Sequence, residues 1–95
     1  MYAVIRESAP PGAMTEQLRA GQTEFAALRA GQPGFVGSLT VDLGDGKWAL
    51  MTLWESQQAA EAGRGVLEPQ ATRLTGRSVR IVYQGEVVAD DLTIR

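Results

Sequence analysis

The sequence has 95 residues, of which 44% are hydrophobic and 21% are charged, and its formal net charge is -2. This length suits one domain with a single core, and the composition is that of an ordinary soluble globular protein. The slightly negative charge argues against a nucleic acid as the main partner, because such binding requires clustered Lys and Arg side chains.

Three residue types are absent from the chain, and their absence restricts its chemistry. Without cysteine there is no disulfide, no thiolate nucleophile and no zinc–sulfur site, and without histidine the commonest metal ligand is missing. Asparagine is absent as well. The first residues do not resemble a signal peptide, and no apolar run approaches the ~20 residues that span a bilayer. We therefore expect a cytoplasmic protein that has no metal site and does not contact a membrane.

The first half of the chain alternates strand and helix signals. Residues 2–6 are β-branched and aromatic, and the prolines and glycine at 10–12 end that strand. Thr15 suits the N-cap of a helix that runs to about Gly31. Residues 35–43 and 48–54 then form two strands, and the Gly-Asp-Gly turn at 44–46 joins them as an antiparallel hairpin.

The second half repeats the order helix then strand. Ser56 suits the N-cap of a second helix, which Gly-Arg-Gly at 63–65 is expected to interrupt before a helical segment resumes at 66–74. A fourth strand lies around 79–84. The tail, 85–95, is either an extension of uncertain role or a short fifth strand.

The element order predicts an α+β, ferredoxin-like βαββαβ fold in one domain over residues 1–95, with a four-stranded antiparallel sheet and both helices on one face. In the third strand both faces are mainly apolar. Trp48, Leu50, Thr52 and Trp54 share one face, and Ala49, Met51 and Leu53 share the other. Because two helices cover one face only, we expect a homodimer that is joined sheet to sheet.

Residues 31–62, which read "GQPGFVGSLTVDLGDGKWALMTLWESQQAAEA", resemble the antibiotic biosynthesis monooxygenase (ABM) family of the dimeric α/β-barrel superfamily. The shared features are the Pro-Gly-Phe turn, the hairpin, and the Trp-Glu-Ser that opens the second helix. The resemblance implies a pocket between sheet and helices in each protomer of the dimeric barrel. Some members oxidise polycyclic phenols to quinones with molecular oxygen and no cofactor, whereas others degrade haem with a histidine ligand that is absent here.

The resemblance also implies site residues. The phenol oxidisers are thought to use a strand asparagine, a tryptophan and an arginine. Trp54 matches the tryptophan, Arg73 is the nearest candidate for the arginine, and Leu50 stands where the asparagine would fall. Trp54 is open to two compatible roles, as a core anchor at the strand–helix junction or as a pocket wall whose indole N–H bonds a planar ligand.

We expect Phe35, Leu50, Leu67 and Tyr83 to contact a hydrophobic small molecule, with Tyr83 able to orient or protonate a substrate oxygen. The favoured function is a cofactor-independent monooxygenase acting on a planar aromatic or quinol-type molecule. The scarcity of titratable side chains keeps a second hypothesis open, a non-catalytic small-molecule-binding or dimerisation module on the same fold.

Overall fold

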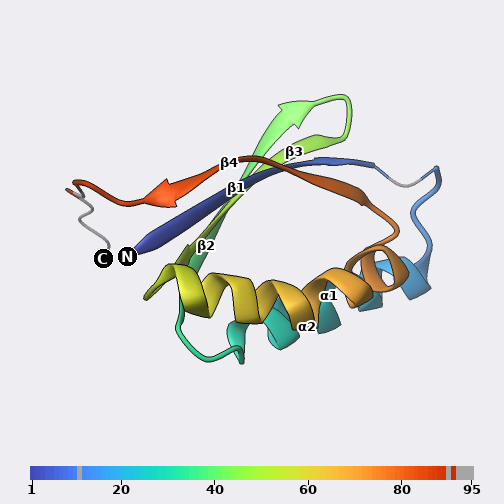
Figure 1. Ribbon diagram of the computed structural model, residues 1–95. Coiled ribbons are helices and arrows are strands. Elements are labelled where there is room, and N and C mark those ends of the chain that lie inside the picture. Colours follow the sequence, from blue (N-terminus) through green and yellow to red (C-terminus); the bar gives the residue numbers. More distant parts are fainter. Residues whose placement is uncertain (11, 90, 92–95) are drawn as a thin grey trace.

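The computed structural model describes residues 1–10, 12–89 and 91 of the chain. Its elements, in chain order, are β1 (Tyr2–Ala9), α1 (Glu16–Ala30), β2 (Phe35–Gly44), β3 (Lys47–Trp54), α2 (Gln57–Thr75) and β4 (Ser78–Glu86). The strands form one antiparallel sheet in the order β2-β3-β1-β4. Both helices lie on the same face of this sheet (Figure 1). The ferredoxin-like βαββαβ fold expected from the sequence is confirmed.

The local signals at the helix starts and at the hairpin turn act as expected. The hydroxyl of Thr15 accepts a hydrogen bond from the Leu18 backbone N–H at 3.1 Å, and Ser56 accepts one from Ala59 at the same distance. At the tip of the β2–β3 hairpin, Asp45 and Gly46 both have positive φ, 55° and 76°. Two such residues make a type I′ turn, whose twist matches that of the flanking strands.

The expected interruption of the second helix at residues 63–65 is wrong, because α2 is continuous from 57 to 75. Gly63 lies where the helix meets the sheet, and a Cβ added there would lie 2.4 Å from Cη2 of Trp54. Pro69 lies in the helix interior and cannot donate the hydrogen bond that the Gly65 carbonyl would otherwise accept. Packing on the sheet therefore outweighs the weak helix propensity of these residues.

The two faces of the sheet differ in what covers them. Tyr2 pairs with Trp54, Val4 with Thr52, and Arg6 with Leu50, and all of these residues face the helices. The core consists of buried residues on that side, namely Tyr2, Val4, Trp54, Ala60 and Leu67.

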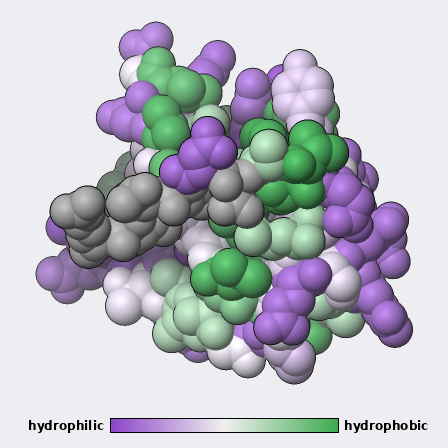
Figure 2. All heavy atoms as spheres, turned by 90° about the vertical axis from the view of Figure 1, so that its left-hand side faces the viewer, coloured by the Kyte–Doolittle hydropathy of each residue, from purple (hydrophilic) through white to green (hydrophobic). Residues whose placement is uncertain are grey.

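The opposite face, which we call the outer face, carries apolar side chains that no described part of the chain covers. Leu39 is 55% exposed and Val41 is 48% exposed. In Figure 2, hydrophobic side chains reach the surface in the upper part of the view, the side on which this face lies. The residues of the outer face are Ala3, Ile5, Leu39, Val41, Ala49, Met51, Leu53 and Tyr83.

The buried guanidinium of Arg77, the residue before β4, links the start of β4 to the end of β1 and to the turn of the β2–β3 hairpin. Arg77 is 5% exposed and donates to Ser8 Oγ at 2.8 Å, to the Ser8 carbonyl at 3.4 Å and to the Gly46 carbonyl at 2.6 Å. Its planar group lies 3.6 Å from the centre of the Trp48 ring, which places a cation over an aromatic face. Burial lowers the pKa of Arg77, and the nearby Asp42 carboxylate opposes that shift. This buried charge is stabilised by acceptors and by an aromatic ring.

The tail has no strand in residues 87–89 and 91, where the backbone N–H of Val87 donates to the Met1 carbonyl at 2.8 Å. The sequence allowed a short fifth strand in this tail. Residues 90 and 92–95, which make up the rest of the tail, lie outside the described residues.

No helix in the described part of the chain is long and apolar enough to cross a membrane.

The fit of α2 on Trp54 predicts that Gly63→Ala destabilises the protein. Overpacking a dense core costs about 1–3 kcal/mol, which exceeds the gain of about 1 kcal/mol that Ala brings to a helix interior. Gly65 is the matched control, because a Cβ added there meets nothing within 4 Å. Gly65→Ala should raise the free energy of unfolding by about 0.5–1 kcal/mol. Urea unfolding of both variants is the measurement, and equal stabilisation by both would contradict the tight contact.

Candidate functional site between the sheet and the helices

A cavity of about 330 Å³ lies between the helix-facing side of the sheet and the two helices. This volume is at the lower end of the range of roughly 300–1,000 Å³ that is usual for small-molecule sites. Most of the lining residues are apolar or carry a positive charge. They are Arg6, Phe25, Arg29, Leu50, Thr52, Trp54, Arg64, Leu67, Glu68, Ala71, Thr72, Val79, Arg80 and Ile81.

Trp54 serves as both a core residue and a cavity wall. Its side chain is 2% exposed, and its six-membered ring rests against Gly63 of α2. The Phe35 ring packs edge-on against the indole with the ring centres 5.3 Å apart. The indole N–H donates to Thr52 Oγ1 at 3.0 Å. A bound ligand would therefore meet the indole as an apolar surface, while the directed hydrogen bond expected from the sequence is made within the protein.

Thr52 connects three groups around one buried hydroxyl. Its oxygen accepts from the indole of Trp54 at 3.0 Å and from the guanidinium of Arg6 at 3.3 Å. The hydroxyl itself donates to the Val4 carbonyl at 3.5 Å. A threonine hydroxyl offers one donor and two acceptor positions, so all three are used. Thr52 thus fixes the indole and the guanidinium relative to each other, although sequence reasoning treated it as one more strand residue.

Arg6 is the functional candidate that sequence reasoning missed. It lies on the central strand β1, between the buried residues Val4 and Ser8, and its side chain is half-buried in the cavity wall. The period of two along a strand places it on the same face as Tyr2 and Val4. An arginine on the core-facing side of a central strand is an unusual placement, because Arg is mostly an exposed residue. That alternation is the sequence signal that could have identified Arg6.

The charges around the cavity are predominantly positive. Burial lowers the pKa of Arg6, the charges of Arg64 and Arg29 lower it further, and Glu68 opposes them. Burial also lowers the pKa of Arg29, whose guanidinium carbon lies 5.9 Å from the centre of the Phe25 ring. Both arginines remain protonated at neutral pH, because the guanidinium is so strong a base.

Two of the lining arginines are held in ion pairs. Glu68 accepts from Arg64 Nε at 2.7 Å, and this pairing lowers the pKa of Glu68 and raises that of Arg64. Arg80 is paired with Glu7, also at 2.7 Å. The single carboxylate among the lining residues is therefore held by a cation of its own helix.

The structure brings together some of the residues expected from the sequence and separates others. Trp54, Leu50 and Leu67 all line the cavity, whereas Phe35 lies behind the indole. Arg73 lies on the exposed side of α2, where it donates to Gln70, and it is not among the lining residues. The arginines that do line the cavity come from β1, β4 and both helices.

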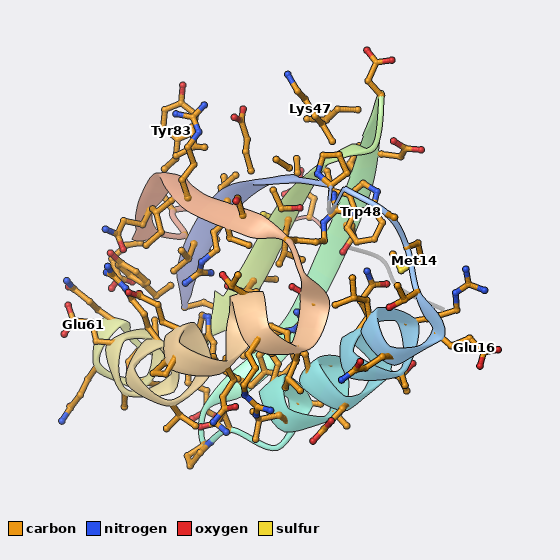
Figure 3. All side chains as sticks on the ribbon, turned by 90° about the vertical axis from the view of Figure 1, so that its right-hand side faces the viewer. Met14, Glu16, Lys47, Trp48, Glu61 and Tyr83 are labelled. Atoms are coloured by element: carbon orange, nitrogen blue, oxygen red, sulfur yellow. The ribbon has the colours of Figure 1, made fainter. Side chains whose placement is uncertain are left out.

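Tyr83 lies on the outer face, 70% exposed, and Figure 3 shows it pointing away from both helices. The cause is a β-bulge in β4. Arg6 pairs with Ile81 while its neighbour Ile5 pairs with Tyr83, so one extra residue is inserted between the two pairs. A one-residue insertion turns the following side chains to the other face of a sheet. Tyr83 is thereby directed away from the cavity, although it follows Ile81 by two positions.

The described residues contain no group of three or more acidic, histidine or cysteine side chains that could hold a metal ion.

No protein-family model matches the sequence, and no curated protein sequence matches it either. Solved structures do match. A putative antibiotic biosynthesis monooxygenase from Deinococcus radiodurans superimposes with a TM-score of 0.69 at 17% identity, covering 100% of this chain and 99% of that one. The chain has the fold of the ABM family.

Two further matches show the range of proteins that share this fold. SnoaB, a cofactor-independent oxygenase from Streptomyces nogalater, matches with a TM-score of 0.64 at 16% identity, over 94% of this chain and 98% of its own. A variant of MhuD with two manganese protoporphyrin IX molecules bound per active site matches with a TM-score of 0.65 at 22% identity, over 98% and 100%. The resemblance to the ABM family read from the sequence is thus confirmed for the fold.

Because the Thr52 hydroxyl makes three hydrogen bonds, we expect Thr52→Val to lower the free energy of unfolding. The substitution keeps the shape but leaves the indole N–H of Trp54 buried without an acceptor, which should cost about 1–3 kcal/mol. Thr40 is the matched control, because it is an exposed threonine on the same face of the neighbouring strand β2. Thr40→Val should change the free energy of unfolding by less than about 0.5 kcal/mol. Denaturant unfolding followed by tryptophan fluorescence measures both, and an equal effect of the two substitutions would contradict the central place of Thr52.

Proposed function

We propose that the protein is a cofactor-independent monooxygenase of the ABM type that acts on a planar aromatic or quinol-type molecule in the cavity between sheet and helices. The observation that carries this proposal is the cavity itself, in which the apolar wall of Trp54 lies beside the guanidinium of Arg6. SnoaB, which is named as a cofactor-independent oxygenase, shares the fold and lends the proposal support.

The proposed reaction uses the substrate as the reductant and dioxygen as the oxidant. A phenol whose ring carries an activated CH₂ group loses a proton, and the resulting anion transfers an electron to dioxygen. Recombination forms a carbon–oxygen bond. Loss of water then leaves a carbonyl group, so that one oxygen atom enters the product and the other leaves as water with the two hydrogens of the CH₂ group.

The protein's part in this reaction is to bind the ring, favour the anion and exclude water. Trp54 and Leu67 provide apolar surface for the ring. Arg6 and Arg29, the lining arginines without a carboxylate partner among the described residues, stabilise the negative charge of the substrate anion, because a cation near an acidic group favours the ionised form. Glu68, the one carboxylate of the lining, is paired with Arg64. The substrate therefore releases its proton to solvent in this proposal, without a dedicated general base.

The oxygenase proposal predicts oxygen consumption with anthrone-type phenols or reduced quinones, measured with an oxygen electrode against the spontaneous rate. Trp54→Phe and Arg6→Gln should each lower kcat/KM by roughly tenfold or more, through loss of ring contact and of anion stabilisation respectively. Arg19→Gln is the control for the charge change, since Arg19 is exposed on α1 and does not line the cavity. Failure of the wild-type protein to consume oxygen across the whole panel would refute the oxygenase function.

The alternative is a non-catalytic small-molecule-binding module on the same fold. It is favoured by the residue types of the cavity, since the lining includes no tyrosine and its one carboxylate is already paired. In that case a ligand raises the melting temperature by mass action and is recovered unchanged. Chromatography of the ligand after incubation in air separates the two functions.

We also propose that two copies pair through the outer face, because its exposed apolar side chains would be covered by the same face of a second copy. Leu39→Asp places a charge on this face and should give a mass of one chain in light scattering coupled to gel filtration, where the wild type gives two. Thr40→Asp is the control, because Thr40 lies on the other face of the same strand. A wild-type protein with the mass of one chain would rule out the pairing.

A further inference from the structure

Arg6 on β1 and Arg77 just before β4 differ sharply in their surroundings. Arg77 makes three hydrogen bonds to protein oxygens and stacks on Trp48. Arg6 makes one side-chain hydrogen bond among the described residues, a long one of 3.3 Å to Thr52. A guanidinium has five N–H donors, so most of those of Arg6 are not used by the described part of the protein.

Arg6 also has no carboxylate partner of its own among the described residues. The three ion pairs of that part of the chain join Met1 to Glu86, Arg64 to Glu68, and Arg80 to Glu7. The lining of the cavity contains four arginines and one glutamate. Two of these positive charges, Arg64 and Arg80, are matched by carboxylates, whereas those of Arg6 and Arg29 are not.

This imbalance of charge has an energetic consequence for Arg6. Burial and the neighbouring cations together lower the pKa of Arg6, which means that its charged form is held at a cost. The guanidinium of Arg6 is half-buried, so it has lost part of the solvation that water would give it, and no carboxylate among the described residues replaces that part. An anion in the cavity would remove this cost, and a neutral molecule would not.

We infer that the ligand of this cavity is a planar aromatic acid, whose ring lies against Trp54 and Leu67 and whose permanently ionised carboxylate is bound by Arg6. The inference rests on the proposed function for the place of the site and adds the chemical class of its ligand. The indole of Trp54 and the guanidinium of Arg6 donate to the same oxygen of Thr52, at 3.0 and 3.3 Å. The ring surface and the anion donor are therefore adjacent, and a carboxylate attached directly to the ring can reach Arg6.

Arg29 has a supporting part in this inference. It lines the cavity from α1, on the side opposite the sheet, and raises the positive potential that an anion meets. Arg6 is the better direct partner, because it donates to the same Thr52 oxygen as the indole of Trp54 and so lies next to the ring surface.

The test compares two probes of nearly equal shape, anthraquinone-2-carboxylate and the neutral anthraquinone-2-carboxamide, by titration calorimetry and by quenching of tryptophan fluorescence. The wild-type protein should bind the acid more tightly than the amide by roughly tenfold to a hundredfold, the range of charge-assisted hydrogen bonds. In Arg6→Gln this preference should disappear. Arg6→Lys should keep part of it, because the charge remains and the fork is lost.

Arg19→Gln is the matched control and should keep the full preference for the acid, since it removes the same charge outside the cavity. Arg29→Gln is a second, independent variant that keeps the test decisive even where Arg6→Gln fails to fold. It should reduce the preference by a smaller factor than Arg6→Gln. Thermal unfolding of each variant without ligand identifies any that has lost its fold.

The outcomes separate this inference from the oxygenase proposal. Equal binding of acid and amide by the wild type, or an undiminished preference in Arg6→Gln and Arg29→Gln, would overturn the inference and leave the oxygenase proposal standing. Preferential binding of the acid without oxygen consumption by any aromatic acid would support the inference and overturn the oxygenase. Binding of neither probe would overturn the inference, whereas the oxygenase proposal would still be decided by the oxygen-consumption measurements.

Discussion

The contact between Trp54 and Gly63 sets the distance between the sheet and α2, and with it the shape of the cavity. The indole cannot yield, because its N–H is held by Thr52 and Phe35 packs against it. The helix approaches it instead, which requires a residue without a side chain at the point of contact. A second close approach, at Gly21 of α1, brings the two helices together, since a Cβ there would lie 1.8 Å from the Leu74 carbonyl oxygen. Gly63 thus lets α2 approach the sheet closely, and Gly21 lets α1 approach α2.

Much of the fold could be read from the sequence, because the signals concerned are local. Thr15 and Ser56 cap the helices by bonding to residues three positions further on, and the turn at Asp45 and Gly46 depends only on its own backbone. The two faces of β3 follow from strict alternation. The resemblance to the ABM family singled out Trp54 by the Trp-Glu-Ser that follows this strand, and the structure places it in the wall of the cavity. Signals of this kind need no knowledge of the rest of the chain.

The features that the sequence did not reveal depend on contacts between distant segments. Gly63 reads as a helix breaker until the indole that it accommodates is known. The bulge that turns Tyr83 outward exists only in the pairing of β4 with β1. Arg73 was singled out by its place in a resemblance, whereas Arg6 reaches the cavity because β1 occupies the centre of the sheet. The strand order, more than any single motif, decides which charged side chains line the cavity.

The strand order also has a consequence for how the chain is made. β1 lies between β3 and β4 in the sheet, and β4 comes after the other five elements in chain order. While the polypeptide is being synthesised, one edge of β1 therefore has no partner until β4 has left the ribosome, and exposed strand edges of this kind pair readily with other chains. Arg77 completes the arrangement, because its acceptors on Ser8 and at Gly46 are already present when it arrives. Until β4 emerges, this edge of β1 is therefore open to pairing with another chain.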